Sequence, residues 1–364
     1  MANIPKILML INQTAGGGAE NVFMMQYRYF ISIGMQVFLG TTACSDMKEK
    51  EEFYNVGFKS VFDIGGYRRL INFIKSRDIR IVYSTLDLSI FVSRVVALFC
   101  PQLVVVIRES GMAYRKSLFL KISDVIFNAR VSAIVAVSRE VADSLLYYQP
   151  FYKQKIEVIS NGATPSMSVE EIIKLRKAKK VSNDTFTIIN VGSMNGDNKG
   201  QDGLIRLAAY IKNHLPNLRY RLLLVGNGSR RSEFEKLVSV LGLEAQISFQ
   251  GFASGGKLKE LYLYSDVFIL NSANEGCPNV ILEAMSYALP VIATPVGSIS
   301  ALIIPEETGW VVKRNDFAMM TDKVKLLIGD PGNMYRTGEA GYRHLVSNFN
   351  FSRQTNKIIE LFTT

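Results

Sequence analysis

Short runs of β-branched and apolar residues recur along the chain, and most of them are separated by stretches with helical spacing. Such alternation is typical of a parallel sheet whose connecting helices cover both faces. The first series of strand-like runs is Ile7–Ile11, Val37–Leu39, Ile79–Tyr83, Leu103–Ile107, Ala133–Val137 and Ile156–Ile159. After a polar stretch the pattern restarts, with runs at Thr187–Val191, Tyr220–Val225, Ile247–Phe249, Val267–Leu270 and Val291–Ala293.

The restart predicts two doubly wound α/β domains. A chain of 364 residues is longer than one hydrophobic core usually serves. We place the domains at residues 1–164 and 165–349, with the join near residues 161–185, and expect a helix at about 350–364 to pack back on the first domain. Because parallel sheets bind ligands at the carboxyl ends of their strands, two such domains facing each other create a cleft lined by strand-end loops.

One strand-end loop carries two carboxylates eight residues apart. Glu275 follows the strand-like run Val267–Leu270 in a turn-prone stretch, and apolar residues at helical spacing from 280 to 288 place Glu283 on the first turns of a helix. The backbone amides at a helix start favour an anion such as a diphosphate. The carboxylates then remain to accept hydrogen bonds from sugar hydroxyls, so the loop predicts a sugar-nucleotide site.

This motif stands in an ordered set of further motifs. They are Gly17-Gly18-Ala19-Glu20, Val135–Ser138, Val158–Gly162, Val191-Gly192 with Lys199-Gly200, Val225–Gly228, Ala284-Met285, Leu289–Gly297 and Glu307–Val312. Together with Glu275-x7-Glu283 they resemble the retaining glycosyltransferases of family 4, over nearly the whole chain. That family has the GT-B architecture, in which two Rossmann-like domains face each other across a cleft, and the resemblance implies the same α/β fold here.

The resemblance also implies roles for single residues. Glu283 would bind the ribose hydroxyls, which suits a carboxylate because it can accept two vicinal hydroxyls at once. Glu275 would hold the donor sugar, and Lys199 would neutralise the donor diphosphate, so these two are the candidate catalytic residues. The remaining candidate donor-binding residues are Gly17, Gly18, Gly192, Ser193, Gly226, Asn227, Phe252, Lys257, Cys277, Pro278 and Asn279.

The chain departs from the family pattern at two places. Ser193 stands where the family usually has an arginine, so the phosphate clamp is weaker or is completed by Arg108, Arg230 or Arg231. Many relatives have a histidine after the fourth strand, where this chain has the loop Ile107-Arg-Glu-Ser-Gly111. We take Arg108, Glu109 and Ser110 as the acceptor-side residues. The two histidines, His214 and His344, fall on predicted helical surfaces.

No Asp-x-Asp triplet occurs, so we expect no metal ion and no cofactor besides the substrate, a UDP- or GDP-linked sugar. If the family mechanism holds, the acceptor hydroxyl attacks from the face that the diphosphate leaves, and configuration is retained. Cys44, Cys100 and Cys277 are too widely spaced for a disulfide framework or a zinc site. They fit a reducing cytoplasm.

The net charge of +10 suits phosphates or anionic lipids, and no nucleic-acid module is recognisable. Residues 1–164 hold 19 Lys and Arg against 13 Asp and Glu, a net of +6. Two basic amphipathic segments, Tyr67–Arg77 and Tyr114–Phe127, predict peripheral contact with an anionic membrane, although each also fits an ordinary surface helix. Met1–Asn12 reads as a first strand rather than a signal peptide, and Leu88–Ile107 as a helix followed by a strand.

We therefore expect an enzyme that transfers a sugar to a glycan or lipid-linked glycan, in bacterial surface polysaccharide or glycolipid assembly. Two alternatives remain open. Ser193 and the missing histidine are compatible with a non-catalytic subunit that binds sugar nucleotides, and the fold also serves epimerases that act on the sugar nucleotide itself. The sequence specifies neither the donor, the acceptor, the linkage nor the oligomeric state.

Overall fold

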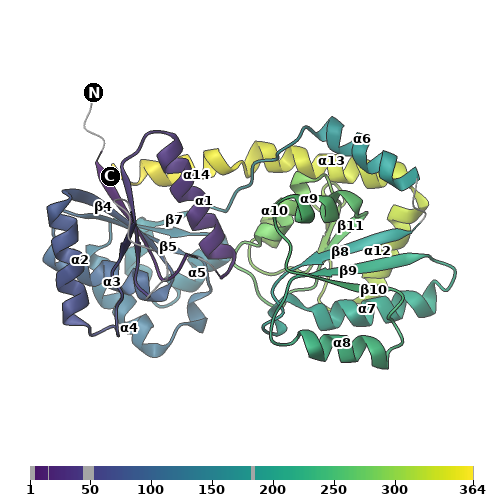
Figure 1. Ribbon diagram of the computed structural model, residues 1–364, viewed down its shortest axis with the longest axis horizontal. Coiled ribbons are helices and arrows are strands. Elements are labelled where there is room, and N and C mark those ends of the chain that lie inside the picture. The colour runs from purple at the N-terminus through teal and green to yellow at the C-terminus, as the bar shows by residue number, and fades with distance from the viewer. Residues whose placement is uncertain (1–4, 15, 44–52, 182–184, 364) are drawn as a thin grey trace. The chain divides into compact units, whose positions relative to one another are not determined.

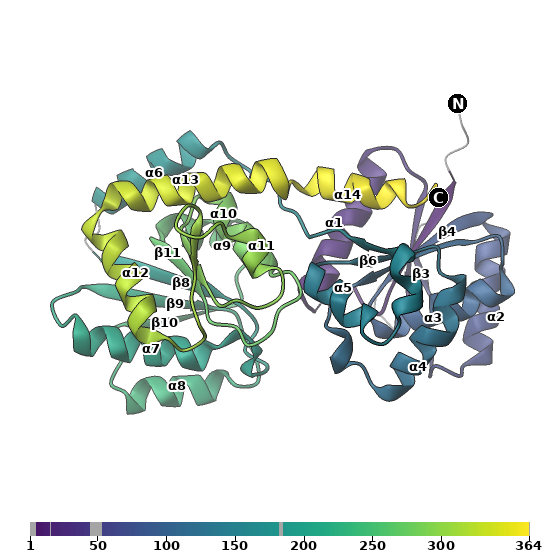
Figure 2. The ribbon, with the colours of Figure 1, turned by 180° about the vertical axis from the view of Figure 1, so that it is seen from behind.

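The computed structural model describes residues 5–14, 16–43, 53–181 and 185–363. The chain divides into two compact units (Figures 1 and 2). The first consists of Met1–Asn161 with Ser352–Thr364, and the second of Gly162–Phe351. Each unit has a parallel sheet at its centre, as the alternation of strand-like and helical segments predicts.

The first unit holds a seven-stranded sheet in the order β3-β2-β1-β4-β5-β6-β7. Every recorded strand pair in it is parallel. The strands are β1 (Lys6–Ile11), β2 (Val37–Thr41), β3 (Phe53–Asn55), β4 (Ile79–Thr85), β5 (Val104–Glu109), β6 (Ala133–Ala136) and β7 (Ile156–Val158). The prediction missed β3, which has three residues and follows a charged stretch. It also ended β5 two residues early, so Arg108 and Glu109 belong to a strand and not to a loop.

Helices cover both faces of this sheet. They are α1 (Gly18–Ser32), α2 (Ile64–Ser76), α3 (Asp87–Phe99), α4 (Leu118–Phe127), α5 (Arg139–Leu146) and α14 (Phe351–Glu360), with short 3-10 turns η1 (Ala113–Arg115), η2 (Asn128–Arg130) and η3 (Pro150–Lys155). The C-terminal segment packs on α1 and β4. The Phe362 ring lies 5.8 Å from the rings of Phe30 and of Tyr83, and the Tyr29 hydroxyl donates to the Asn356 side chain.

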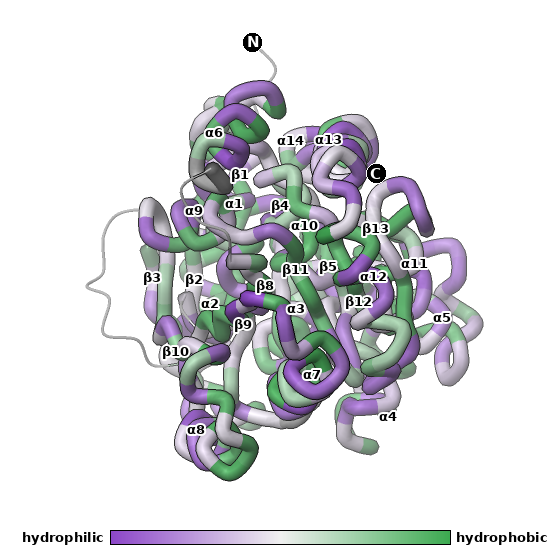
Figure 3. The backbone as a smooth tube through the Cα atoms, turned by 90° about the vertical axis from the view of Figure 1, so that its right-hand side faces the viewer, coloured by the Kyte–Doolittle hydropathy of each residue, from purple (hydrophilic) through white to green (hydrophobic). Residues whose placement is uncertain are grey.

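The second unit has a six-stranded parallel sheet in the order β10-β9-β8-β11-β12-β13. The strands are β8 (Phe186–Val191), β9 (Tyr220–Val225), β10 (Ile247–Gly251), β11 (Val267–Leu270), β12 (Val291–Ala293) and β13 (Gly309–Val311). The helices are α6 (Val169–Val181), α7 (Gln201–His214), α8 (Arg231–Val240), α9 (Gly255–Tyr264), α10 (Asn279–Ser286), α11 (Ile299–Leu302), α12 (Phe317–Gly329) and α13 (Pro331–Asn348), with the turn η4 (Asp197–Lys199). Figure 3 shows hydrophobic strands beneath helices of mixed polarity.

The prediction missed the short strand β13, and it also missed α13, although α13 is the longest helix among the described residues. Three glycines, at 332, 338 and 341, weaken its helical pattern in the sequence. The structure shows a reason for one of them. A Cβ on Gly338 would lie 1.9 Å from the Ala288 carbonyl oxygen, so only glycine allows α13 to pack this closely on the chain after α10.

Arg176 anchors α6 to the amino-terminal ends of strands β11 and β12 in the second sheet. The side chain is buried, and its guanidinium donates hydrogen bonds to the carbonyls of Ala288, Ser265 and Asp266. These carbonyls precede strands β11 and β12. Burial lowers the pKa of Arg176 from its ordinary value, against the opposing effect of the Asp266 carboxylate. Losing this cation would leave three carbonyl groups without their donor.

We expect Arg176→Ala to destabilise the second unit by about 3 kcal/mol, because buried carbonyls lose their partner and a cavity opens. The fluorescence of Trp310 reports on this unit, since the chain has one tryptophan and its side chain is buried there. Urea denaturation followed by this signal should show a lower midpoint. Lys174→Ala, an exposed change on the same helix, is the control, and equal midpoints for the two variants would contradict the anchoring role.

Candidate functional site

Three adjacent strands of the second unit, β9, β8 and β11, end at one edge of the sheet, and their loops carry most of the predicted donor-binding residues. Gly192 and Ser193 follow β8, and Gly226 and Asn227 follow β9. Cys277, Pro278 and Asn279 lie with Glu275 in the connection from β11 to α10. Phe252 follows β10 at the end of the row, and Lys257 lies in the first turn of α9. The structure thus brings these residues to one edge of the sheet.

An ion pair joins two of these loops. The Lys199 ammonium, in η4, lies 2.7 Å and 2.8 Å from the two carboxylate oxygens of Glu275. The Ser272 hydroxyl donates to the same carboxylate at 2.8 Å. Glu275 is buried, whereas the Lys199 side chain is 28% exposed. The cation therefore remains accessible from solvent, while its partner is fixed within the loop.

Glycines allow the loops to approach this closely. Gly200 has a φ of +66°, and a Cβ there would lie 2.0 Å from the carbonyl oxygen of Asn271. Gly297 has a φ of +55°, and a Cβ there would lie 2.1 Å from the carbonyl oxygen of Glu275. Any other residue would force both contacts apart and would adopt a disfavoured backbone conformation. Gly200 thus allows the loops that carry Lys199 and Glu275 to meet, and Gly297 allows a third loop to pack on the Glu275 backbone.

Asn271, which follows β11, fixes the start of the same loop. The side chain is fully buried and exchanges two hydrogen bonds with Asn315, to the side chain at 2.7 Å and from the backbone amide at 3.0 Å. The Ala273 amide also donates to the Asn198 carbonyl, which ties this loop to η4. Asn271 has no predicted role, since its partner lies 44 residues away in the sequence and no local pattern marks the pair.

Glu283 lies on the second turn of α10. The Tyr262 hydroxyl, from α9, donates to its carboxylate at 3.0 Å. Burial is the larger effect and raises the pKa of Glu283 above its ordinary value, whereas the Tyr262 hydrogen bond lowers it. The sequence prediction missed Tyr262 as a partner of Glu283. The Tyr262 side chain is itself fully buried, so the orientation of the carboxylate is set from within the protein.

The start of α10 points toward the loop that holds Glu275. Pro278 occupies the N-cap position and has no side-chain acceptor for the first amides of the helix. The Gly276 carbonyl accepts a hydrogen bond from the Ser298 amide, which holds the loop in front of α10. The positive end of the α10 dipole thus lies near the cation Lys199 and the carboxylate Glu275, an arrangement suited to a phosphate.

The predicted substitutes for the missing arginine have other partners. Arg230 pairs with Glu233 at 2.5 Å and lies over the Phe234 ring, and Arg231 pairs with Glu235 at 2.8 Å. Arg231 also donates a hydrogen bond to the side chain of Asn227, which is one of the predicted donor-binding residues. Ser193 is exposed, and its carbonyl accepts a hydrogen bond from Gln201.

The remaining site residues lie in the first unit, at the carboxyl ends of its central strands. Gly17 precedes α1 as its N-cap, and Gly18 is the first residue of that helix. A pocket of about 350 Å³ opens at the ends of β1, β4 and β5. Its lining residues are Asn12, Leu86, Asp87, Ile90, Arg108, Glu109, Ser110, Gly111, Met112, Arg115 and Lys116. The three predicted acceptor-side residues are thus together in its wall.

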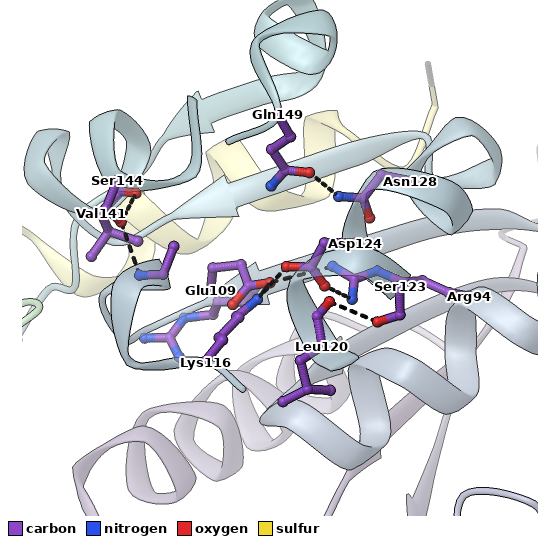
Figure 4. A network of polar contacts seen from close by, with 12 residues as sticks. Arg94, Glu109, Lys116, Leu120, Ser123, Asp124, Asn128, Val141, Ser144 and Gln149 are labelled. Carbon is purple, nitrogen blue, oxygen red and sulfur yellow. Dashed lines mark hydrogen bonds and ion pairs between the residues drawn. The ribbon is translucent and has the colours of Figure 1, made fainter. Parts of the chain in front are cut away.

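A cluster of four buried charges adjoins this pocket, and two of them, Glu109 and Lys116, belong to its lining (Figure 4). Arg94 pairs with Glu109 at 3.4 Å and also with Asp124, and Lys116 pairs with the same two carboxylates at 2.5 Å and 2.9 Å. All four side chains are nearly inaccessible to solvent, and two cations balance two anions. Burial lowers the pKa of Lys116, but Glu109 and Asp124 outweigh it and raise the pKa above its ordinary value. Glu109 therefore has a structural partner on two sides.

Arg108 is likewise held in place. Its guanidinium donates to the side chain of Asn161 at 2.5 Å, and it is 2% exposed. Asp87, at the start of α3, has a side chain in the pocket wall, where desolvation raises the pKa of its carboxyl. Asn12 accepts hydrogen bonds from the backbone and hydroxyl of Ser89. Neither Asn12 nor Asp87 has a role in the sequence prediction.

The other sequence expectations have the following outcomes. His214 ends α7 stacked on Tyr210, and His344 lies on α13 beside Phe349, outside the strand-end loops. Leu88–Ile107 divides into α3 and β5, as predicted. Cys100 and Cys277 are buried cysteines that form no disulfide, while Cys44 lies outside the described residues. Within residues 5–14, 16–43, 53–181 and 185–363, no group of three His, Cys, Asp or Glu is placed to hold a metal, and no helix is both long and apolar enough to cross a membrane.

Two family models match successive parts of the chain. The model described as Glycosyltransferase Family 4 matches residues 16–166, and that described as Glycosyl transferases group 1 matches residues 171–344. The crystal structure of Anabaena HepE in complex with UDP superposes with a TM-score of 0.83 at 19% identity, covering 98% of this chain and 99% of that one. The chain is a glycosyltransferase family 4-like protein with the GT-B fold. The fold prediction is therefore confirmed.

Curated relatives match part of this family 4-like chain. An uncharacterized glycosyltransferase of Methanocaldococcus jannaschii is 32% identical over 188 residues, covering 50% of this chain and 47% of that protein. The lipopolysaccharide core biosynthesis glycosyltransferase LpsD of Rhizobium meliloti is 28% identical over 215 residues, covering 58% of this chain and 58% of that protein. The chain thus spans about half the length of the curated relatives that it matches.

We expect Glu283→Gln to stabilise the protein at neutral pH in the absence of ligand. Burial penalises the ionised carboxylate, so the folded-state pKa lies above the ordinary value of 4.5. The stabilising contribution of Glu283 is therefore full below pH 4.5 and is lost as the pH rises through the folded-state pKa. The neutral glutamine of the variant does not ionise and therefore keeps this stabilising contribution at all pH values. The melting temperature of the variant at pH 7.5 should be roughly 2–4 °C higher than that of the wild type.

The measurement is thermal denaturation of wild type and variant across this pH range. The difference should vanish toward pH 4.5, where Glu283 is protonated in the folded chain and increasingly so in the unfolded one. Glu233→Gln is the control, since pairing with Arg230 lowers the pKa of Glu233 and removing this charge brings no gain. Equal melting temperatures for wild type and Glu283→Gln at pH 7.5 would show that burial of this carboxylate is without cost.

Proposed function

We propose that the protein is a glycosyltransferase that moves a sugar from a UDP- or GDP-linked donor to a glycan or lipid-linked glycan, with retention of configuration and without a metal ion. One observation carries the proposal. The Lys199–Glu275 ion pair lies at the carboxyl ends of the strands of the second sheet. It is next to the start of α10, the helix that carries Glu283. A cation, a helix start and two carboxylates match the diphosphate, sugar and ribose of such a donor.

The roles follow from this match. The accessible Lys199 ammonium would bind the diphosphate and stabilise the charge that develops as the bond to the anomeric carbon breaks. Glu275, with the backbone of Cys277, Pro278 and Asn279, would hold the sugar hydroxyls, and Glu283 the ribose. The acceptor oxygen forms a bond to the anomeric carbon, the electron pair of the breaking bond leaves with the diphosphate, and a diphosphate oxygen takes the acceptor proton.

The relatives support the choice of donor and pathway. HepE, which shares the fold, is crystallised with UDP, and LpsD is described as a lipopolysaccharide core biosynthesis glycosyltransferase. We therefore propose a place in bacterial surface polysaccharide or glycolipid assembly, at the cytoplasmic face of the membrane. No cofactor besides the donor is proposed.

The pocket of the first unit supports the choice of acceptor. Its wall contains hydrogen-bonding groups of both kinds, among them Asn12, Asp87 and Ser110. Sugar hydroxyls both donate and accept, so such a wall suits a saccharide. A volume of about 350 Å³ is at the lower end of the range for small-molecule sites. We propose that it takes the terminal sugar of the acceptor.

A non-catalytic sugar-nucleotide-binding subunit is the competing function. Ser193 favours it, because this hydroxyl supplies no positive charge where the family usually has an arginine, and Arg230 and Arg231 are paired with carboxylates of α8. Such a subunit would bind the donor and show no turnover, so a combined binding and turnover experiment separates the two functions.

We expect one of the common UDP- or GDP-sugars to raise the melting temperature of the protein and to be hydrolysed or transferred, in EDTA as well as with Mg²⁺. Lys199→Ala should weaken donor binding by about tenfold or more, since a charge-assisted contact to phosphate is lost. Glu275→Gln should retain more donor binding than Lys199→Ala while losing turnover, since the amide replaces one acceptor oxygen by a donor.

The control is Lys236→Ala, an exposed change on α8 that should leave binding and turnover as in wild type. Binding without turnover across a broad acceptor panel would favour the non-catalytic subunit. Donor binding that is unchanged in Lys199→Ala would overturn the proposed role of the ion pair. Turnover that disappears in EDTA and returns with Mg²⁺ would overturn the metal-independent reaction.

A further inference from the structure

Helix α4 of the first unit has its polarity inverted. Its buried side chains are Ser123 and Asp124, the latter with no exposed surface. Four of its apolar side chains point outward, with Leu118 exposed by 73%, Phe119 by 45%, Ile122 by 51% and Ile126 by 58%. A surface helix of a water-soluble protein normally turns its apolar residues to the core. We define these four residues as the α4 apolar face.

Buried charge fixes this orientation. Asp124 pairs with Arg94 of α3 and with Lys116, and it accepts a hydrogen bond from the Tyr148 hydroxyl. Rotating α4 to bury its apolar residues would pull Asp124 away from both cations and leave buried charges without partners, at a large free-energy cost. The exposure of the α4 apolar face is therefore a stable feature of the folded unit.

Neighbouring aromatic residues extend the α4 apolar face. Phe62, which precedes α2, is 74% exposed, and its ring lies 6.3 Å from the ring of Phe119. Tyr114, in η1 just before α4, is also exposed. Aromatic rings are common where a protein meets the interface of a bilayer. Several large apolar side chains thus project from one region of the surface, which marks it as an interaction surface.

Most charges around this surface are basic, although Asp63, the N-cap of α2 beside Phe62, pairs with Arg69 at 3.7 Å. Arg68, Arg69 and Lys75 are the charged residues of α2, and Arg115 is that of η1. Helix α4 contains Lys121 and the buried Asp124. The exposed charged side chains of α2, η1 and α4 are all basic, so the elements that carry or neighbour the apolar face bring cations. An anionic bilayer offers both the apolar interior and the negative surface that complement them.

The two basic segments seen in the sequence then have different roles. The apolar residues Leu70 and Ile74 of α2 are buried, so α2 is an ordinary surface helix that contributes charge. Helix α4 alone, of the two, has an apolar face left over. We infer that the α4 apolar face enters the interfacial layer of an anionic membrane, with the cations of α2 and η1 on the lipid headgroups.

The position of α4 next to the pocket suggests a function for the membrane contact. Arg115 and Lys116 line the pocket at the ends of the strands, and Ser117, the next residue, is the N-cap of α4. A membrane bound at α4 therefore lies next to the pocket. The pocket can then bind the sugar of a lipid-linked acceptor while the lipid stays in the bilayer. This use rests on the proposed function, whereas the membrane contact does not.

The test places a tryptophan in the α4 apolar face. In Ile122→Trp, the new fluorophore is exposed, while the native Trp310 is buried in the second unit and gives a constant background. Vesicles of phosphatidylcholine with phosphatidylglycerol should shift the emission to shorter wavelength, and brominated acyl chains should quench it. Val240→Trp, at an exposed apolar position at the end of α8, should show neither effect.

An Ile122→Trp emission that no vesicle changes would overturn the inference. So would an emission that shifts with protein concentration in the absence of vesicles, because the α4 apolar face would then be an interface between copies of the chain. A shift with anionic vesicles, together with little or none with phosphatidylcholine alone, is the expected result.

A second variant separates insertion from attraction by charge. Ile122→Asp leaves the basic residues in place, and since this position faces water the variant should fold and bind nucleotide as wild type does. We expect flotation with anionic vesicles to fall by about tenfold or more. Flotation as in wild type would overturn insertion and leave adsorption by charge only. A wild type that binds no nucleotide would count against the proposed function and not against the membrane contact.

Discussion

The ion pair between Lys199 and Glu275 is the contact around which the second unit arranges its strand-end loops. It connects the loop after β8 with the loop after β11, whose strands are neighbours in the sheet. Gly200 allows the loop after β8 to approach the loop after β11, and Gly297 allows the loop after β12 to approach the Glu275 backbone, while Asn271 fixes the end of β11. The result is a cation that stays accessible beside a carboxylate that is held rigidly.

The first unit uses buried charge in another way. Four nearly inaccessible side chains, from α3, β5, the segment before α4, and α4, form a neutral network of two cations and two anions. This network supplies Glu109 and Lys116 to the lining of the pocket, and it also orients α4 so that its apolar residues face outward. The buried position of Asp124 thus leads to an exposed apolar surface on α4.

Strands and most helices could be predicted from sequence because fully buried parallel strands are continuous apolar runs, such as Ile7–Ile11. The missed elements lack this signal: β3 and β13 have three residues each, and glycines obscure α13. The second-unit loops that carry donor-site motifs lie at one end of the sheet, because strand order brings them there. Partners such as Asn315 and Tyr262 are distant in sequence and have no local pattern. The same holds for Asp124, whose charge looked like part of an ordinary amphipathic helix.

The central claim is that Lys199 binds the diphosphate of a nucleotide. The most direct measurement is calorimetric titration with nucleoside mono- and diphosphates of uridine and guanosine, in wild type and in Lys199→Met, which keeps the aliphatic stem and removes the charge. The wild type should prefer the diphosphate of its nucleoside by about tenfold or more, and the variant should lose most of this preference. An equal preference in both proteins would contradict the account.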